Sequence, residues 1–193
     1  LVITSGGQQY VVLGANFNGA ITQLGDVNHP TIQGVGSNDV IYAGSGNHTI
    51  IAGPGNTFIN TGTGHDSIIG GVGVNTIVYS ALDTHVYGGS GLSNTLWFAA
   101  DNTQVNFVGE TVFTGFNIIN LKSVLDVAGN SLTLNAASVN TLSPTDALTV
   151  HGGTLDNLNL IANDYWVAGA VAPGQTTTTY TSLSGSVITV DNA

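Results

Sequence analysis

A nine-residue repeat between Gly34 and Val78 constrains the fold of this chain more than any other feature of its sequence. The repeating strings are GVGSNDVIY, AGSGNHTII, AGPGNTFIN, TGTGHDSII and GGVGVNTIV. From the second string on, a Gly-X-Gly pair recurs every nine residues, at Gly44/Gly46, Gly53/Gly55, Gly62/Gly64 and Gly71/Gly73. Paired glycines followed by a β-branched run at a short, fixed period are typical of a stack of turns and short strands. Such a stack presents long regular faces and edges rather than a deep pocket.

The repeat also predicts which side chains form the core. The first pair, Gly34/Gly36, lies ten residues before the second, so Tyr42 is interpreted as a one-residue insertion. An aliphatic residue then recurs in each string, and these residues are Val40, Ile50, Ile59, Ile68 and Ile77. Two strings make one coil, and coils stack at the strand spacing of roughly 4.8 Å. We therefore expect an all-β chain, a right-handed parallel β-solenoid of the β-roll or β-helix type, with a short helical turn and terminal caps.

The sequence predicts a single elongated domain, because no Ser/Pro-rich linker or charge run divides it. Four stretches are expected in order: N-terminal rungs at 1–33, the nonapeptide array at 34–98, further rungs at 99–161 and a C-terminal cap at 162–193. In the third stretch, Asn135 is a suitable N-cap for one or two helical turns that reach Leu142. Pro144 should prevent their extension.

The charge balance excludes several classes of partner. The formal net charge is −10, and Lys122 is the only Lys or Arg in the chain. Proteins bind nucleic acids by placing Lys and Arg against phosphates, and anionic membrane surfaces repel an acidic chain. We therefore expect no nucleic acid among the partners and no insertion into a membrane. No apolar run approaches the length of a membrane-spanning helix.

The cysteine count and the first residues bear on the compartment. Cysteine is absent, so no disulfide framework exists, which fits a reducing compartment or a secreted bacterial protein without disulfides. The chain does not start with a basic segment followed by an apolar one, the pattern of a signal peptide. We expect a processed chain, another export route or a fragment of a larger protein.

The five strings resemble the glycine-rich nonapeptide repeats of the RTX (haemolysin-type) secreted bacterial proteins. A sixth unit, at 88–96, matches with one inserted residue. The stretches at 130–139 and 148–152 resemble segments of large bacterial surface proteins and adhesins, a less specific similarity. The resemblance implies a parallel β-roll, export by a type I system to the extracellular space or cell surface, and calcium bound in the turns.

The chain departs from the RTX pattern at the position where that family has Asp. Here the residues at this sixth position are Asn38, His48, Thr57, Asp66 and Asn75. Alternate units lie on the same side of the roll. One side would therefore stack Asn38, Thr57 and Asn75, none of which has a carboxylate, and the other would stack His48 on Asp66. Calcium prefers six to eight oxygen ligands, and its affinity follows the number of carboxylates. We expect that no cofactor is required, that calcium binds weakly if at all, and that Asn and Thr form hydrogen-bonded ladders instead.

Three residues are weak candidates for metal ligands. His48 and Asp66 should lie one coil apart, and Asp156 sits in a Gly-rich turn that is similar to the repeats. The alternative is that all three are polar turn residues. We expect no enzyme, because β-helix polysaccharide lyases need several basic side chains and this chain has no Arg and a single Lys, Lys122. In addition, no carboxylate pair or nucleophile motif stands out.

Three functions remain open. The first is a secreted structural protein that assembles into a filament, surface layer or biofilm matrix, as a homo-oligomer or polymer. Head-to-tail stacking would place the N-terminal rungs of one copy on the C-terminal region of the next. The second is an RTX-like calcium-binding module of a large adhesin or exoprotein. The third is a fragment of a polysaccharide-active β-helix enzyme.

Overall fold

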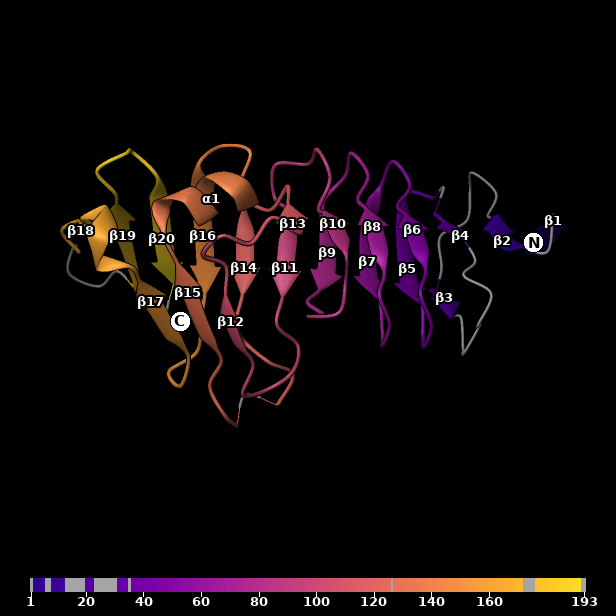
Figure 1. The fold of residues 1–193 in the computed structure, drawn as a ribbon, viewed down its shortest axis with the longest axis horizontal. Coiled ribbons are helices and arrows are strands. Elements are labelled where there is room, and N and C mark those ends of the chain that lie inside the picture. The colour runs from indigo at the N-terminus through magenta and orange to yellow at the C-terminus, as the bar shows by residue number, and fades with distance from the viewer. Residues whose placement is uncertain are drawn as a thin grey trace. The chain divides into compact units, whose positions relative to one another are not determined.

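The computed structural model describes residues 2–5, 8–12, 20–22, 31–34, 36–125, 127–171 and 176–191. The chain divides into two compact units, the N-terminal unit Leu1–Thr95 and the C-terminal unit Leu96–Ala193. Almost all of the regular structure in both units is β-strand, and most neighbouring strands pair in parallel (Figure 1). The prediction of an all-β chain is confirmed. The boundary between the two units falls within the strand Thr95–Trp97. The interpretation of the chain as a single domain stays a prediction.

The N-terminal unit contains two sheets whose strands alternate along the chain. Its strands are β1 (Val2–Ser5), β2 (Gln8–Val12), β3 (Ala20–Thr22), β4 (Thr31–Gln33), β5 (Asn38–Tyr42), β6 (Thr49–Ile51), β7 (Asn56–Asn60), β8 (Ser67–Ile69), β9 (Asn75–Val78) and β10 (His85–Tyr87). One sheet has the order β1-β2-β4-β6-β8-β10 and the other the order β3-β5-β7-β9. All these pairs are parallel except β1–β2, which is antiparallel. The predicted rungs of residues 1–33 contain β1 to β4, and the side chains before Thr31 lie outside the described part.

The register of these strands explains the repeat. Thr31 pairs with Thr49, and Thr49 pairs with Ser67, so each step along the sheet advances two nonapeptides. The same inward position of successive strands is occupied by fully buried aliphatic residues, namely Ile32, Ile41, Ile50, Ile59, Ile68, Ile77 and Val86. Each buried side chain of this size stabilises the unit by about 1.5–3 kcal/mol. The aliphatic ladder is therefore the core of the unit.

The sequence interpretation of the first nonapeptide is wrong by one residue. Ile41, not Val40, pairs with Ile59 and is completely buried, whereas Val40 is only half-buried beside Phe58. Tyr42 pairs with Asn60 and is no insertion. The glycines of the first string are displaced by one position relative to those of the later strings. Strand pairing nevertheless sets the register, because side chains on a strand alternate between the buried and the outer face.

The repeated glycines are required for two different reasons. Gly44 and Gly62 lie in turns on one side of the unit and have positive φ values of 86° and 80°, a region that side chains disfavour. Gly71 and Gly73 lie in turns on the other side and do not have positive φ, although Gly89, one coil after Gly71, does (111°). A Cβ atom on Gly71 or Gly73 would collide with the carbonyl oxygens of Gly53 and Gly55 in the preceding coil. The same collision would occur on the first side, between a Cβ atom on Gly62 and the carbonyl oxygen of Gly44. Close stacking of backbones thus requires glycine on both sides, and positive φ adds to it at Gly44 and Gly62.

The C-terminal unit is less regular. Its strands are β11 (Thr95–Trp97, which begins at the division), β12 (Gln104–Asn106), β13 (Phe113–Thr114), β14 (Ile118–Asn120), β15 (Ser131–Leu134), β16 (Ala147–His151), β17 (Asn157–Leu160), β18 (Val167–Ala168), β19 (Thr177–Thr181) and β20 (Val187–Asp191). One sheet runs β11-β14-β16-β20-β19-β18 and the other β12-β15-β17. Within the predicted cap, β19 pairs antiparallel with both β18 and β20, so the parallel pattern ends there.

The predicted helical turn is confirmed. Helix α1 spans Ala136–Leu142, and Asn135 caps it by accepting a hydrogen bond from the backbone N–H of Ser138 at 2.8 Å. The Ser138 hydroxyl closes the reciprocal half of this capping box. The helix ends two residues before Pro144, which cannot continue it. A short 3-10 helix, η1 (Ala162–Asp164), follows β17.

Candidate functional site

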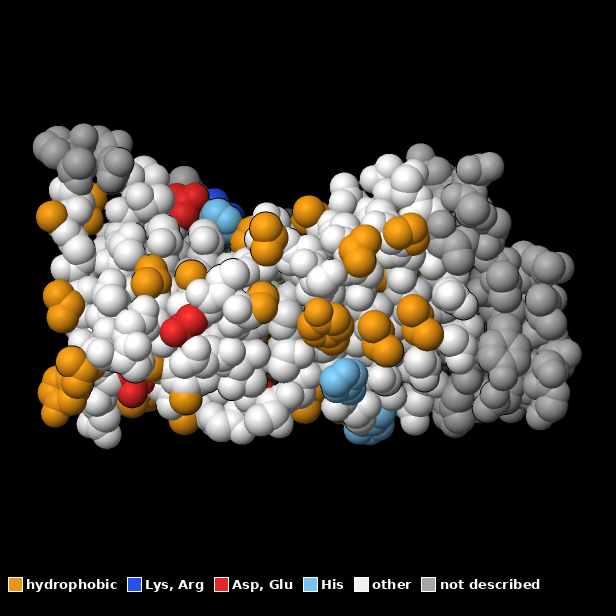
Figure 2. Space-filling view, turned by 90° about the horizontal axis from the view of Figure 1, so that it is seen from above, with side chains coloured by type: hydrophobic (Ala, Val, Ile, Leu, Met, Phe, Trp, Pro, Cys, Tyr) orange, Lys and Arg blue, Asp and Glu red, His pale blue; other side chains and the backbone are white. Residues whose placement is uncertain are grey.

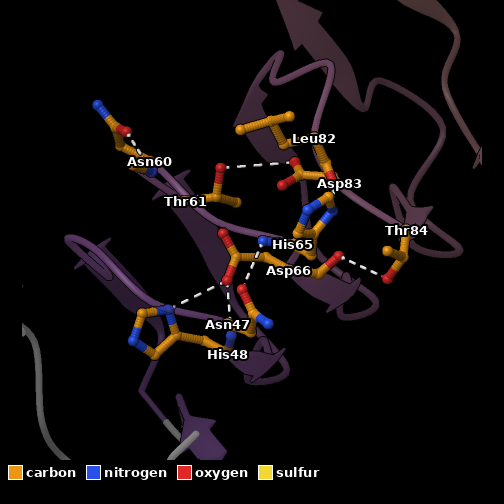
Figure 3. A network of polar contacts seen from close by, with 10 residues as sticks. Asn47, His48, Asn60, Thr61, His65, Asp66, Leu82, Asp83 and Thr84 are labelled. Atoms are coloured by element: carbon orange, nitrogen blue, oxygen red, sulfur yellow. Dashed lines mark hydrogen bonds and ion pairs between the residues drawn. The ribbon is translucent and has the colours of Figure 1, made fainter. Parts of the chain in front are cut away.

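Three buried polar side chains from successive turns of the N-terminal unit form the first candidate site. His48 directly precedes β6 and Asp66 directly precedes β8, and because these strands pair in register the two residues stack one coil apart. The backbone N–H of His48 donates to Asp66 Oδ1 at 2.6 Å, and His48 Nδ1 lies 3.0 Å from the same oxygen. Asp83 belongs to the loop that follows β9, and Thr61 Oγ1 donates to its Oδ2 at 3.4 Å (Figure 3).

The cluster of His48, Asp66 and Asp83 is shielded from water, and some of its polar atoms make no hydrogen bond in the described structure. Asp66 is fully buried, and His48 and Asp83 are exposed by 3% and 6%. Among the described residues, three of their atoms have no hydrogen-bond partner: His48 Nε2, Asp66 Oδ2 and Asp83 Oδ1. Buried polar atoms without partners are uncommon because each costs desolvation free energy. The sequence interpretation brought His48 and Asp66 together but missed Asp83, which lies outside every Gly-X-Gly string.

The electrostatics of the cluster favour protonated carboxyl groups. Burial raises the pKa of Asp66, and hydrogen bonds from His48 oppose that rise. Burial, with a smaller contribution from the charge of Asp66, raises the pKa of Asp83 from its ordinary 3.8 to about 7. Neighbouring His65 is exposed, and its Nδ1 lies 2.8 Å from the carbonyl oxygen of Leu82. A buried cluster of this kind binds protons at a higher pH than exposed carboxylates do.

Among the described residues, the cluster lacks the nucleophile of a catalytic triad and the number of ligands that a metal site needs. His48 Nε2 has no hydroxyl partner within the described chain, so the His–Asp pair has no neighbouring nucleophile of the kind that a Ser-His-Asp triad requires. No group of three or more His, Asp or Glu side chains in the described ranges is arranged to hold a metal ion. Asp156 lies in the C-terminal unit and is not part of the cluster. Its two oxygens accept from the backbone N–H groups of Asn130 and Gly153, both at 2.7 Å.

The turns on the opposite side of the N-terminal unit are filled by amides. Asn75 Nδ2 donates to the carbonyl oxygens of Gly71, Gly73 and Gly88 at 3.0–3.3 Å. Asn94 Nδ2 donates to the carbonyls of Gly89 and Gly91 at 3.0 and 2.9 Å, and its Oδ1 accepts from the backbone N–H of Asn75. The amide groups therefore occupy the space toward which the turn carbonyls point. These coil-to-coil hydrogen bonds confirm the predicted polar ladder at Asn75, whereas Thr57, one coil earlier, leaves its Oγ1 without a partner among the described atoms.

Asp39, not Asn38, is the first member of this ladder. Strand pairing aligns Asp39 with Thr57 and Thr57 with Asn75, whereas Asn38 is exposed. The expectation that this side carries no carboxylate is therefore wrong. Asp39 Oδ2 accepts from the Gly36 N–H at 3.1 Å, and Oδ1 has no partner among the described atoms. Counting back eighteen residues from Thr57 would have identified it.

The outer edge of β17 is a second candidate site. In the order β12-β15-β17 this strand lies at the end of its sheet and pairs only with β15. Leu158 and Leu160 stack on the fully buried Leu132 and Leu134 but are themselves only half-buried. They line an open groove of about 340 Å³ together with Asp156, Tyr180 and Val190. The interior of the C-terminal unit is thus incompletely covered at this edge, a feature that sequence analysis did not locate.

The surface is poor in charge. The face in Figure 2 shows few acidic side chains among neutral polar and scattered apolar ones. Exposed apolar residues include Leu155, Tyr165, Val167 and Leu183 of the C-terminal unit. No helix in the described ranges is long and apolar enough to span a membrane.

Comparison with known proteins gives no match: neither family models, curated proteins nor solved structures are significantly similar to this chain.

Proposed function

We propose that this chain is a secreted structural protein, a right-handed β-solenoid that assembles with copies of itself into an extracellular filament, surface layer or matrix. The observation that carries the proposal is the unpaired strand edge at β17, where a ladder of stacked leucines ends half-exposed. Exposed strand edges are sites of pairing between chains unless charge, proline or a bulge blocks them. The residues of β17 are Asn, Leu, Asn and Leu, so none of these blocks is present.

The filling of the turns supports the same function. Asn75 and Asn94 satisfy turn carbonyls without a metal ion, so the N-terminal unit can keep its stacked strands in surroundings where calcium varies. The scarcity of charge supports contacts made by backbone and neutral side chains. Such contacts are weakly screened by salt.

A calcium-binding module of RTX type is the second candidate function. It is favoured by Asp66 and Asp83, which are buried, lie near each other and keep one oxygen each without a partner. A bound cation would neutralise both carboxylates. Two carboxylates are few for a tight calcium site, which places this function second.

Light scattering and electron microscopy of the purified chain distinguish the two functions. A structural protein should form oligomers or filaments that grow with protein concentration and persist in chelator and in 1 M salt, where the Debye length is about 3 Å. Assembly that disappears in chelator and returns with calcium would favour the module. A chain that stays monomeric at every concentration would overturn the structural proposal.

A further inference from the structure

We propose that two copies of this chain pair through the outer edge of β17, in antiparallel orientation about a two-fold axis that passes beside Asn159. The contact rests on the proposed self-assembly and specifies one of its interfaces. It differs from head-to-tail stacking because the same edge is used by both copies. An edge elsewhere on the chain would have to join such dimers into a longer assembly.

The backbone of β17 has the polarity that this pairing needs. The N–H groups of Asn157 and Ile161 donate to carbonyls beside β15, at 2.8 and 3.0 Å. Backbone groups alternate in direction along a strand, so the N–H and C=O groups of Leu158 and Leu160 point to the open edge. In a two-fold antiparallel pair, Leu158 of one copy lies opposite Leu160 of the other. Each residue then donates its backbone N–H to the carbonyl oxygen of the other, which gives two hydrogen bonds. The two-fold axis generates a second, identical pair of hydrogen bonds.

The side chains are self-complementary in the same register. Residues directly opposite one another lie on the same face, so leucine meets leucine on the inner face and Asn159 meets Asn159 on the outer face. The inner face continues the leucine ladder of β15 and β17 across the axis and covers the groove beside Tyr180. A single strand thus provides both halves of the contact, as an interface between identical subunits requires.

The charges near β17 favour a second copy over other partners. Asp156 and Asp164 flank the strand, while the strand itself carries no charge. In the two-fold register Asp156 lies opposite Ala162, and Asp164 lies opposite Thr154, so no carboxylates face each other. Asp156 lines the groove, but both of its oxygens already accept backbone N–H bonds, and a basic partner would find no acidic group on the strand itself. A second copy therefore matches the neutral centre and avoids repulsion at the rim.

Engineered cysteines test the contact directly, because the native chain contains none. The Asn159–Asn159 pair is non-hydrogen-bonded, with Cα atoms about 4.5 Å apart, which suits a disulfide. Full-length Asn159→Cys should form a covalent dimer under mild oxidation. Asn157→Cys is the matched control: the residue is equally exposed on the same strand, but two-fold pairing separates its copies by more than about 7 Å. It should stay largely monomeric on a non-reducing gel.

A charge-swap experiment provides the second readout. Asn159→Lys and Asn159→Asp should each raise the dimer Kd roughly fivefold, because like charges would face each other across the axis. Mixing the two variants should restore association. Asn157→Lys should leave the Kd unchanged, and circular dichroism checks that every variant folds.

The outcomes separate this contact from the function on which it rests. If the native chain assembles but Asn159→Cys forms no more disulfide than Asn157→Cys, the two-fold contact is wrong and self-assembly stands. If charge variants at residue 159 associate like the native chain, the contact is wrong as well, and head-to-tail stacking becomes the better arrangement. A native chain that is monomeric throughout overturns both proposals.

Discussion

The two sides of the N-terminal unit follow one repeat but fill their turns differently. On one side, the amides of Asn75 and Asn94 donate to converging carbonyls, and Asn94 Oδ1 accepts from the backbone N–H of Asn75. On the other side, the carboxyl groups of Asp66 and Asp83 are buried with one oxygen each unpartnered in the described structure. An amide is a neutral donor and acceptor, whereas a carboxylate only accepts and carries charge. The comparison indicates that the turns of Asn75 and Asn94 supply their own donors, whereas the stability of the turns that hold Asp66 and Asp83 depends on pH.

Replacing Asn75 with Asp should produce the largest effect. The carboxylate would face the carbonyls of Gly71, Gly73 and Gly88, which would lose their donor. We expect a loss of about 3–5 kcal/mol in the free energy of unfolding, because an uncompensated buried charge is strongly destabilising. Urea unfolding followed by circular dichroism measures the change. Asn38→Asp, at an exposed position of β5, should stay within about 0.5 kcal/mol. Equal effects of the two substitutions would contradict the role given to the Asn75 amide.

The carboxyl side should make stability depend on pH. Asp83 has a folded-state pKa of about 7, above its ordinary 3.8, so the folded chain holds this proton more tightly than the unfolded chain. The resulting stabilisation is complete below pH 4 and is lost as the pH rises through 7. Its size is at most on the order of 4 kcal/mol. Unfolding midpoints between pH 4 and 8 measure it, and Asp83→Asn should flatten the profile. A stability that rises steadily over this range, in native chain and variant alike, would refute the assignment.

The repeat predicted much of the N-terminal unit because one physical constraint determines it. A period of nine with a constant aliphatic position requires stacked strands, and Ile50, Ile59, Ile68 and Ile77 are all buried as predicted. The register of the first string was not predictable from glycine spacing alone. Glycines can move by one position when the turn tolerates it, but Ile41 must face the core, so pairing decides the register.

The candidate sites were predictable only where they follow the repeat. His48 and Asp66 occupy equivalent positions, and their contact was foreseen. Asp83 comes from an irregular loop, and its burial depends on how that loop packs against Thr61. The open edge of β17 depends on sheet order, which local patterns such as alternating Leu and Asn do not reveal. The helix at 136–142 was predictable because its cap and stop signals are local.

Replacing Asp66 or Asp156 singly by Asn should change the free energy of unfolding by smaller amounts, with opposite sign at the two positions. Asp66→Asn replaces a carboxyl group whose ionisation burial opposes, and its Oδ1 still accepts from the His48 N–H, so we expect a gain of about 1 kcal/mol at pH 8. Asp156→Asn should lose about 1 kcal/mol, because both oxygens of Asp156 accept backbone N–H bonds and an amide nitrogen cannot. Urea unfolding of the full chain measures both. Destabilisation by Asp66→Asn would show that the Asp66 carboxylate is compensated by the His48 ring, 3.0 Å away, or by a partner outside the described atoms.

Calcium should have the smallest effect. The Asn75 and Asn94 amides fill the turn centres on one side, and no group of three candidate metal ligands occurs in the described ranges. Excess chelator should therefore change the free energy of unfolding by less than about 0.5 kcal/mol. At pH 8, above the pKa of Asp83 of about 7, 1 mM calcium should stabilise the chain by only about 0.4 kcal/mol if its Kd is near 1 mM. The gain should vanish at pH 5 and in Asp83→Asn, because protonation or amidation removes the second carboxylate. Calorimetry with and without chelator measures these shifts. Unfolding on chelation, reversed by calcium, would show that the carboxyl side holds a true calcium site and would favour the RTX-like module over the metal-independent structural protein.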